Sequence, residues 1–241
     1  MPGKGFNKQV LGVDGCRGGW VACVLHGHAP LSLSLYATIQ QLWDAHRDAS
    51  LVMIDIPIGL AGKDLLVREC DRLARRMLGK KGSSVFTPVC REALHAHDYS
   101  TACSIQERIT GKKISIQSWN ITPKIREADR LMLASPSARN AFRETHPEIN
   151  FMQLHNGPML AAKRSSAGRE ARLQLLAGFI ENAATMYRDA LHQYPRKMVQ
   201  PDDLLDAMVN MVAGMKGKDA IRSLPDPPQK DEEGLAAALW Y

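Results

Sequence analysis

Four aspartates have types and spacings that suit chemistry. Asp14 and Asp55 each follow a short apolar run typical of a buried strand. An unpaired carboxylate in an apolar interior is costly, and two close together repel each other unless a cation offsets them. Asp203 and Asp206 are three residues apart in the last predicted helix, so both face the same side of it. These acids therefore predict a site where several carboxylates meet.

The chemistry such a site can perform depends on a cation. Mg²⁺ prefers oxygen ligands and often binds substrate phosphate through one or two carboxylates. Two such ions about 4 Å apart can activate a water and stabilise the leaving oxygen of a phosphodiester. We expect Mg²⁺ (or Mn²⁺) as cofactor, with these metal ligands: Asp14, Asp55, Asp203 and Asp206. Glu144 and Glu148 come from the region of a predicted fifth strand.

Each of these acids also has a purely structural interpretation. Asp14 beside a glycine can shape a turn, and Asp55 before Ile-Pro can cap a loop. Asp203 can complement the dipole of its helix, whereas Asp202 is rotated by about 100° and is better placed as the N-cap. Asp206 lies deeper among apolar residues, where the dipole explanation is weaker. The combination of acids with strand order therefore counts for more than any one of them.

The elements that position the acids begin with a meander. Apolar and alternating runs predict three strands, joined by tight turns, at 10–14, 20–25 and 31–36. The first turn has three glycines in five residues, and two tight turns between successive strands indicate antiparallel pairing. Thr38 is the predicted N-cap of a helix that runs to about residue 48. The apolar run 51–54 then reads as a central strand buried on both faces.

The rest of the chain is mostly helical. We interpret residues 60–140 as a mostly helical insertion in a single 1–241 domain, with a separate small domain as the alternative. Its predicted helices are 65–78, 93–109 and 123–133. Trp119, in a predicted loop, can stack on a base or belong to the core. The remaining predictions are a strand at 140–146, helices at 170–193 and 201–215, and a loose tail with an apolar end at 235–241.

Basic residues lie beside the acids in sequence order. The chain has a formal net charge of +6, which suits a polyanionic partner. Arg17 lies in the glycine-rich turn, and a Ser-Ser-Ala-Gly loop at a helix start is flanked by basic side chains. The predicted substrate-binding residues are Arg17, Lys163, Arg164 and Arg169.

Composition and the distribution of apolar residues argue against several classes of protein. The five cysteines are odd in number and none forms a CxxC pair, so neither a zinc ribbon nor a disulfide framework is indicated. Reduced thiols suit the cytoplasm. The first nine residues do not resemble a signal peptide, and no apolar run approaches the roughly 20 residues of a membrane helix. We expect a cytoplasmic protein without a membrane partner. The oligomeric state stays open, a homodimer included.

Six motifs in a fixed order, within residues 10–213, resemble those of the DUF429 proteins. They are GVDGCRGGW (12–20), IDIPIG (54–59), RECD (68–71), SSVF (83–86), HPE (146–148) and DDLLDA (202–207). That family is described as predicted nucleases with a ribonuclease H-like (RNase H-like) fold. The resemblance implies an α/β architecture, in which helices flank a mixed sheet whose first three strands are antiparallel.

The resemblance also implies site residues. In the RNase H-like superfamily, acids on the first and fourth strands and on a late helix hold the metals, which would be Asp14, Asp55 and Asp203 or Asp206. Paired acids on the last helix are similar to those of the Holliday-junction resolvase branch. Glu148 departs from that branch, and is either a catalytic ligand peculiar to this family or a structural cap.

Our leading hypothesis is a metal-dependent phosphodiester hydrolase, a nuclease that cleaves DNA or RNA by in-line water attack at two metal ions. One alternative is a kinase or ATPase of the actin–hexokinase kind, in which the turn 14–19 holds phosphate. A second phosphate loop of the Asp-x-Gly-Gly type is missing from the sequence. The other alternative is a non-catalytic module that binds nucleic acid or protein with its basic face.

Overall fold

The computed structural model describes residues 9–27, 29–158 and 161–241. The chain forms two compact units. The sheet unit comprises Met1–Asp55, Asn140–Ile221 and Tyr241, and the helical unit comprises Ile56–Arg139 and Arg222–Trp240. All the predicted catalytic, metal and substrate-binding residues belong to the sheet unit.

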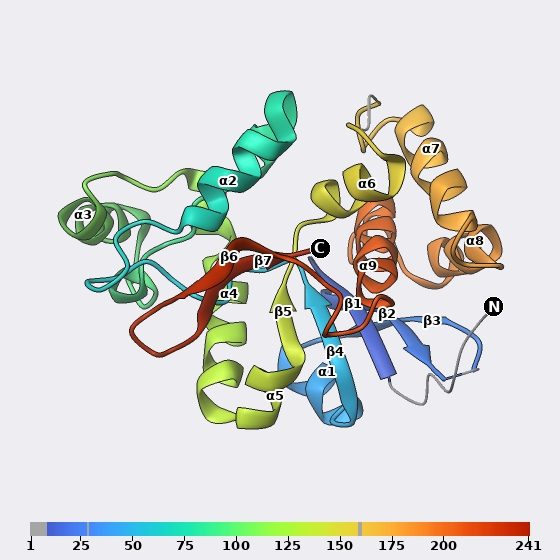
Figure 1. Cartoon of the computed structure of the whole chain (residues 1–241), viewed down its shortest axis with the longest axis horizontal. Helices are drawn as coiled ribbons and strands as arrows, with labels where there is room; N and C mark the ends of the chain where they lie inside the picture. The colour runs from blue at the N-terminus through green and yellow to red at the C-terminus, as the bar shows by residue number, and fades with distance from the viewer. Residues whose placement is uncertain (1–8, 28, 159–160) are drawn as a thin grey trace. The chain divides into compact units, whose positions relative to one another are not determined.

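The sheet unit is built on five strands in the order β3-β2-β1-β4-β5 (Figure 1). These are β1 (Gln9–Cys16), β2 (Gly19–His26), β3 (Ser32–Tyr36), β4 (Ala49–Ile54) and β5 (Phe142–Glu144). The pairs β1–β2 and β2–β3 are antiparallel, while β4 pairs parallel with both β1 and β5. The predicted meander and mixed sheet are therefore confirmed.

Six helices belong wholly or partly to this unit within the described residues. They are α1 (Ile39–Ala45), α5 (Pro136–Ala141), α6 (Pro147–His155), α7 (Ser166–Ala177), α8 (Ala183–Gln193) and α9 (Pro201–Gly214). The predicted N-cap Thr38 is confirmed, since its side chain accepts a hydrogen bond from the Gln41 amide. The prediction of one helix over 170–193 was wrong, because α7 ends at Ala177 with Gly178 as its C-cap, and a new helix begins at Ala183.

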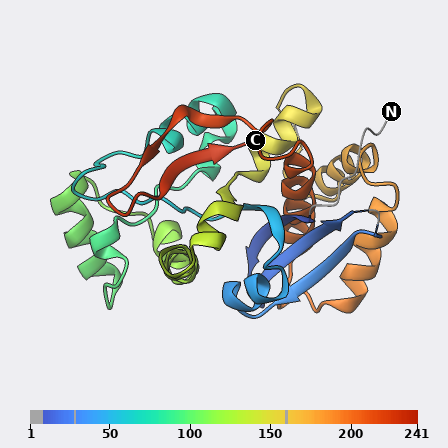
Figure 2. The ribbon, with the colours of Figure 1, turned by 60° about the horizontal axis from the view of Figure 1, so that its bottom comes forward.

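Helix α9 packs very closely on the sheet. A Cβ atom on Gly12 of β1 would lie 2.0 Å from the Met211 nitrogen and 2.2 Å from the Ala207 oxygen. On Gly214, a Cβ would lie 2.8 Å from Val10 Cγ1. The two backbones meet at Gly12 because a glycine has no side chain to separate them. Figure 2 shows α9 against the blue strands of the meander.

The helical unit combines helices with a hairpin. It contains α2 (Glu69–Leu78), α3 (Tyr99–Thr110), α4 (Ile116–Ala134), the 3₁₀ turns η1 (Gly79–Ser84) and η2 (Arg91–Ala93), and the antiparallel pair β6 (Ser223–Lys230) and β7 (Ala236–Trp240). Arg91 forms ion pairs with Asp129 at 2.7 Å and with Asp231. Asp231, which directly follows β6, also accepts a hydrogen bond from the Leu60 amide. It therefore connects the hairpin to two other segments of the helical unit.

Two sequence predictions in this unit were wrong. The third helix begins at Ile116, because Ser115 caps it through the Ser118 amide, and Trp119 is therefore helical. The tail that we predicted to be loose forms β6, despite its prolines. Within the described residues no helix is both long and apolar enough to span a membrane.

Candidate metal centre

The parallel pairing of β1 with β4 brings Asp14 and Asp55 together. Gly12 lies opposite Met53 and Val13 opposite Ile54, and the Asp55 amide extends the ladder by donating to the Val13 carbonyl at 3.1 Å. Side chains alternate along a strand, so Asp14 lies on the face of Gly12. That face is the one covered by α9. The ends of two neighbouring strands therefore present carboxylates beneath the same helix.

The first turns of α9 supply the other two acids. Asp203 and Asp206 lie just before Ala207, where the helix contacts Gly12. Asp206 is only 2% exposed, whereas Asp203 is half-buried and its Oδ2 accepts a hydrogen bond from the Gln200 amide at 2.8 Å. Asp202 is not the N-cap that we predicted, because Gln200 caps the helix in a reciprocal pair with Asp203.

Electrostatics show that the four carboxylates act on one another. Burial raises the pKa of Asp14 well above its ordinary value, and the charges of Asp206, Asp55 and Asp203 raise it further. Burial also raises the pKa values of Asp55 and Asp206. The pKa of Asp203 is raised to about 6, again mainly by burial. The cluster is therefore short of positive charge.

One ammonium group offsets part of this charge. Lys163 Nζ lies 2.8 Å from Asp206 Oδ2 and 3.7 Å from Asp202 Oδ2. Its charge lowers the pKa of each of the four clustered aspartates. Burial by itself would lower the pKa of Lys163, but the charges of Asp206 and Asp14 outweigh it and raise that pKa. Lys163 is thus a charged partner of the acids.

The donor set fits a hard divalent cation. All four candidate ligands are carboxylates, and Mg²⁺ and Mn²⁺ prefer to be coordinated by such oxygen groups. Asp206 Oδ1 is buried and has no hydrogen-bond partner among the described residues. In the same parts of the chain, no three of these aspartates have carboxylate oxygens all within 4.8 Å of one another. Binding of a cation would therefore bring the carboxylates closer to one another.

Glu148 has a different partner. Its carboxylate accepts from Arg172 Nη2 in a buried ion pair at the start of α6. Arg172 Nη1 also donates to the carbonyl oxygens of Ala161 and Gly168, at 3.3 and 3.1 Å. These two carbonyls flank Lys163 in the chain. Glu148 thereby anchors, through Arg172, the segment that presents the ammonium to Asp206.

Two of the four predicted basic residues form ion pairs with aspartates of α9. The Arg164 side chain is 87% exposed, and its Nε is 3.8 Å from Asp202 Oδ2. Arg169 donates to the Arg164 carbonyl. Arg17 is exposed in the two-residue turn between β1 and β2. Lys163 and Arg164 thus contact aspartates of α9.

Three polar residues around the centre were missed by sequence reasoning. The charge of His146 lowers the pKa of Asp55, and its Nδ1 is buried without a hydrogen-bond partner among the described residues. Asn210 Nδ2 donates to the Val13 carbonyl at 3.2 Å, and its Oδ1 accepts from Asn150 Nδ2 at 2.9 Å. The sequence signal that could have identified Asn210 is its position within an apolar helix, where a buried amide needs a hydrogen-bond partner.

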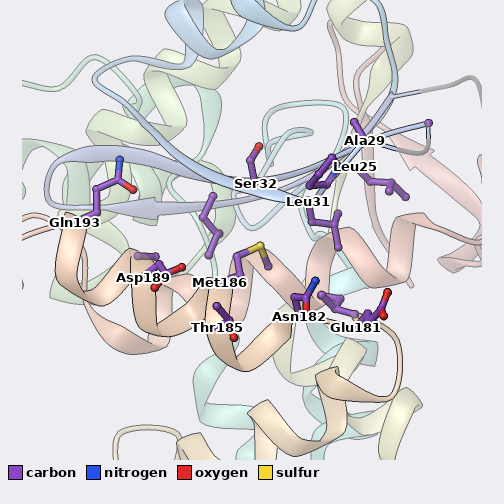
Figure 3. A pocket seen from close by; sticks show the side chains of 15 residues that line it. Leu25, Ala29, Leu31, Ser32, Glu181, Asn182, Thr185, Met186, Asp189 and Gln193 are labelled. Atoms are coloured by element: carbon purple, nitrogen blue, oxygen red, sulfur yellow. The ribbon is translucent and has the colours of Figure 1, made fainter.

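A separate hollow of about 870 Å³ lies between the β2–β3 connection and α8 (Figure 3). Leu25 and Leu31 line it from the strand side and Met186 from the helix, while Glu181 and Asp189 add acidic groups. None of the predicted site residues lines it. The hollow is therefore distinct from the aspartate centre.

Comparison with known proteins gives one result. A family model described as "Protein of unknown function (DUF429)" matches residues 12–230. Comparison with curated proteins and with solved structures gives no match.

Proposed function

The chain belongs to the DUF429 family, and from its aspartate centre we propose that it is a metal-dependent phosphodiester hydrolase, a nuclease acting on DNA or RNA. The observation that supports this most is the buried Asp206 with an unpartnered Oδ1, beside Asp14, Asp55 and Asp203. A protein that keeps four repelling carboxylates between a sheet and the start of one helix gives up stability unless a cation joins them.

The residues around the centre have separate roles in this proposal. Asp14, Asp55, Asp203 and Asp206 would hold Mg²⁺ or Mn²⁺, which supplies positive charge to phosphoryl oxygens and activates a water. Lys163 contributes an ammonium next to Asp206, and the exposed Arg164 attracts the phosphate backbone. Arg172 and Glu148 fix the segment between them. Asn210 fixes the end of β1 on which Asp14 stands.

The architecture supports the same proposal. One acid lies near the end of the first strand of the mixed sheet, one directly after the fourth strand and two on a late helix, which agrees with the arrangement that the resemblance to RNase H-like nucleases implies. We place the activity in the cytoplasm, because all five cysteines are buried free thiols. Nucleic acid is the expected partner, given the net charge of +6.

The glycine-rich turn favours the nuclease over the kinase or ATPase alternative. A phosphate cradle needs free backbone N–H groups. In this turn the Gly15 amide donates to Asp14 Oδ1 at 2.9 Å, and the Gly18 amide donates to the Met198 carbonyl at 2.8 Å. Two of its amides are thus already bonded within the protein.

The test is cleavage of assorted single- and double-stranded DNA and RNA with Mg²⁺, with Mn²⁺ and with EDTA. We expect metal-dependent cleavage by the wild type and a loss of at least about 100-fold in Asp14→Asn, the size typical for a lost electrostatic group. Asp219→Asn, which changes an exposed acid of the same unit, is the matched control and should cleave normally. Equal cleavage by wild type and Asp14→Asn would reject the assignment.

A further inference from the structure

The two oxygens of Asp206 differ in their surroundings. Oδ2 accepts from Lys163 Nζ at 2.8 Å. Oδ1 is buried and has no hydrogen-bond partner in the described chain. A buried carboxylate oxygen without a partner is costly. A further cation would therefore bind on the Oδ1 side, since Oδ2 already contacts the Lys163 ammonium.

Hydrogen bonds on both sides of Lys163 hold its backbone segment in place. Ser165 caps α7 by accepting from the Gly168 amide at 3.0 Å, and its hydroxyl donates to the Ala162 carbonyl at 2.8 Å. A Cβ on Gly168 would lie 1.9 Å from that same carbonyl, so the segment folds tightly onto the start of the helix. Arg172 binds the carbonyls on both sides of Lys163. These bonds position the backbone of Lys163, and the ion pair with Asp206 holds its ammonium in the centre.

The charges of the centre set how many ions it needs. The four clustered aspartates bring four negative charges when fully ionised, and Lys163 returns one. One divalent cation leaves the set at −1, whereas two would leave it at +1, and the neighbouring pair of Asp202 and Arg164 adds no net charge to either total. A lysine ammonium is a compact point charge that can take the place of an ion beside a carboxylate.

We propose that the centre binds one divalent cation, on the Oδ1 side of Asp206, and that the Lys163 ammonium on Oδ2 serves as the second positive charge. This inference rests on the proposed metal-dependent function and replaces the two metal ions expected from the sequence with one ion and the ammonium. In a complex with nucleic acid, the three N–H groups of the ammonium can bond both Asp206 and a phosphate oxygen. Lys163 thereby links the acid cluster to the substrate.

The test is the stoichiometry of Mn²⁺ binding, measured by isothermal titration calorimetry on the full chain. We expect one equivalent in the wild type, one in Lys163→Arg, which keeps the charge, and two in Lys163→Ala, which vacates the second position. Lys197→Ala, an exposed lysine of the same unit, should bind one. Circular dichroism and thermal unfolding check that each variant is folded.

The outcomes separate this inference from the proposed function. Two equivalents in the wild type, or one equivalent in both the wild type and Lys163→Ala, would overturn the role of Lys163 while leaving a metal-dependent enzyme intact. No Mn²⁺ binding by any folded variant would overturn the metal-dependent function itself. If Lys163→Ala unfolds, Lys163→Gln replaces it with the same expectation of two equivalents.

Discussion

Asp14 is repelled by each of the other three carboxylates of the centre. Burial and three neighbouring acids raise its pKa well above the ordinary value. In Asp14→Asn, the side-chain amide keeps the bond from Gly15 and adds N–H donors that suit a neighbouring carboxylate. We expect the metal-free variant to be more stable than the wild type by about 1 kcal/mol, which raises the melting temperature by roughly 2–4 °C.

The same variant should lose its response to metal. Differential scanning calorimetry with and without Mn²⁺ measures both effects. A ligand that binds only the folded state raises the melting temperature, so Mn²⁺ should stabilise the wild type and Asp219→Asn but not Asp14→Asn. A destabilised Asp14→Asn that Mn²⁺ still stabilises would contradict the role given to Asp14.

Asp203 predicts the pH dependence of the metal-free protein. Its folded pKa of about 6 exceeds the ordinary 3.8, so the folded state binds the proton more tightly than the unfolded state. The contribution of this group to stability is complete below 3.8 and is lost as the pH rises to about 6. We expect the melting temperature of Asp203→Asn to fall less steeply over this interval than that of the wild type. Parallel curves for the two proteins would be inconsistent with this titration.

At the scale of single residues, the sequence predicted acids more readily than their partners. Strand ends and a three-residue helical spacing singled out Asp14, Asp55, Asp203 and Asp206, and the charges of the last three raise the pKa of Asp14. The ion pair between Lys163 and Asp206 joins a loop to a helix without a sequence pattern. Asp202 was mistaken for the N-cap because Gln200, a rarer cap, satisfies the same helix end.

At the scale of elements, the centre depends on the contact between β1 and α9. In Gly12→Ala, the new Cβ would overlap backbone atoms of α9 at 2.0 and 2.2 Å, and backbone cannot rotate away as a side chain can. We expect a loss of about 3 kcal/mol in stability, measured by urea unfolding, because overpacking a core costs this much. The control is Gly178→Ala, whose nearest contact would be 3.4 Å. Equal stability of the two variants would mean that α9 can shift.

The buried ion pair between Glu148 of α6 and Arg172 of α7 predicts a second effect at the scale of elements. Glu148→Gln leaves the Arg172 charge buried without its counter-ion, which costs about 3 kcal/mol in stability. The double variant Glu148→Leu/Arg172→Met should be more stable than Glu148→Gln. Because the Glu148 carboxylate is paired with Arg172 and Lys163 bonds Asp206 directly, we expect Mn²⁺ to bind Glu148→Gln with unchanged stoichiometry. Loss of Mn²⁺ binding from a folded Glu148→Gln would show instead that Glu148 is a ligand.

Periodicity predicted the elements unevenly. The meander and the buried fourth strand have strong alternating or continuous apolar patterns, and the structure confirms them. The hairpin of β6 and β7 was missed because three prolines in β6 are typical of loops. Helix α4 extends across Pro123, which we took as a helix start. In both cases packing within the helical unit overrides a local signal.

For the whole molecule, the net charge of +6 predicts salt-dependent binding of nucleic acid. Arg164 is exposed beside the centre, so Arg164→Gln should weaken binding of a fluorescent oligonucleotide. It should also reduce the slope of log affinity against log salt by about 1. Arg188→Gln, an exposed change on α8, should leave the slope unchanged. Equal slopes for the two variants would mean that the strand does not pass Arg164.

The division of the whole chain was hard to see in the sequence. The helical unit consists of Ile56–Arg139 and the distant Arg222–Trp240, and no glycine- or serine-rich linker marks where the chain passes from one unit to the other. The family, in contrast, was accessible from short motifs, because they retain their order over nearly the whole matched length. The order of the motifs therefore identified the family, whereas the composition of the chain did not identify its two units.

The most direct measurement is a crystal structure of the wild type soaked in Mn²⁺, with anomalous scattering used to locate the ion. The account predicts one manganese peak contacting Asp14 and Asp206 Oδ1, with Asp55 drawn toward it and Lys163 still bonded to Oδ2. An empty aspartate centre at saturating Mn²⁺, or manganese bound only elsewhere, would contradict it.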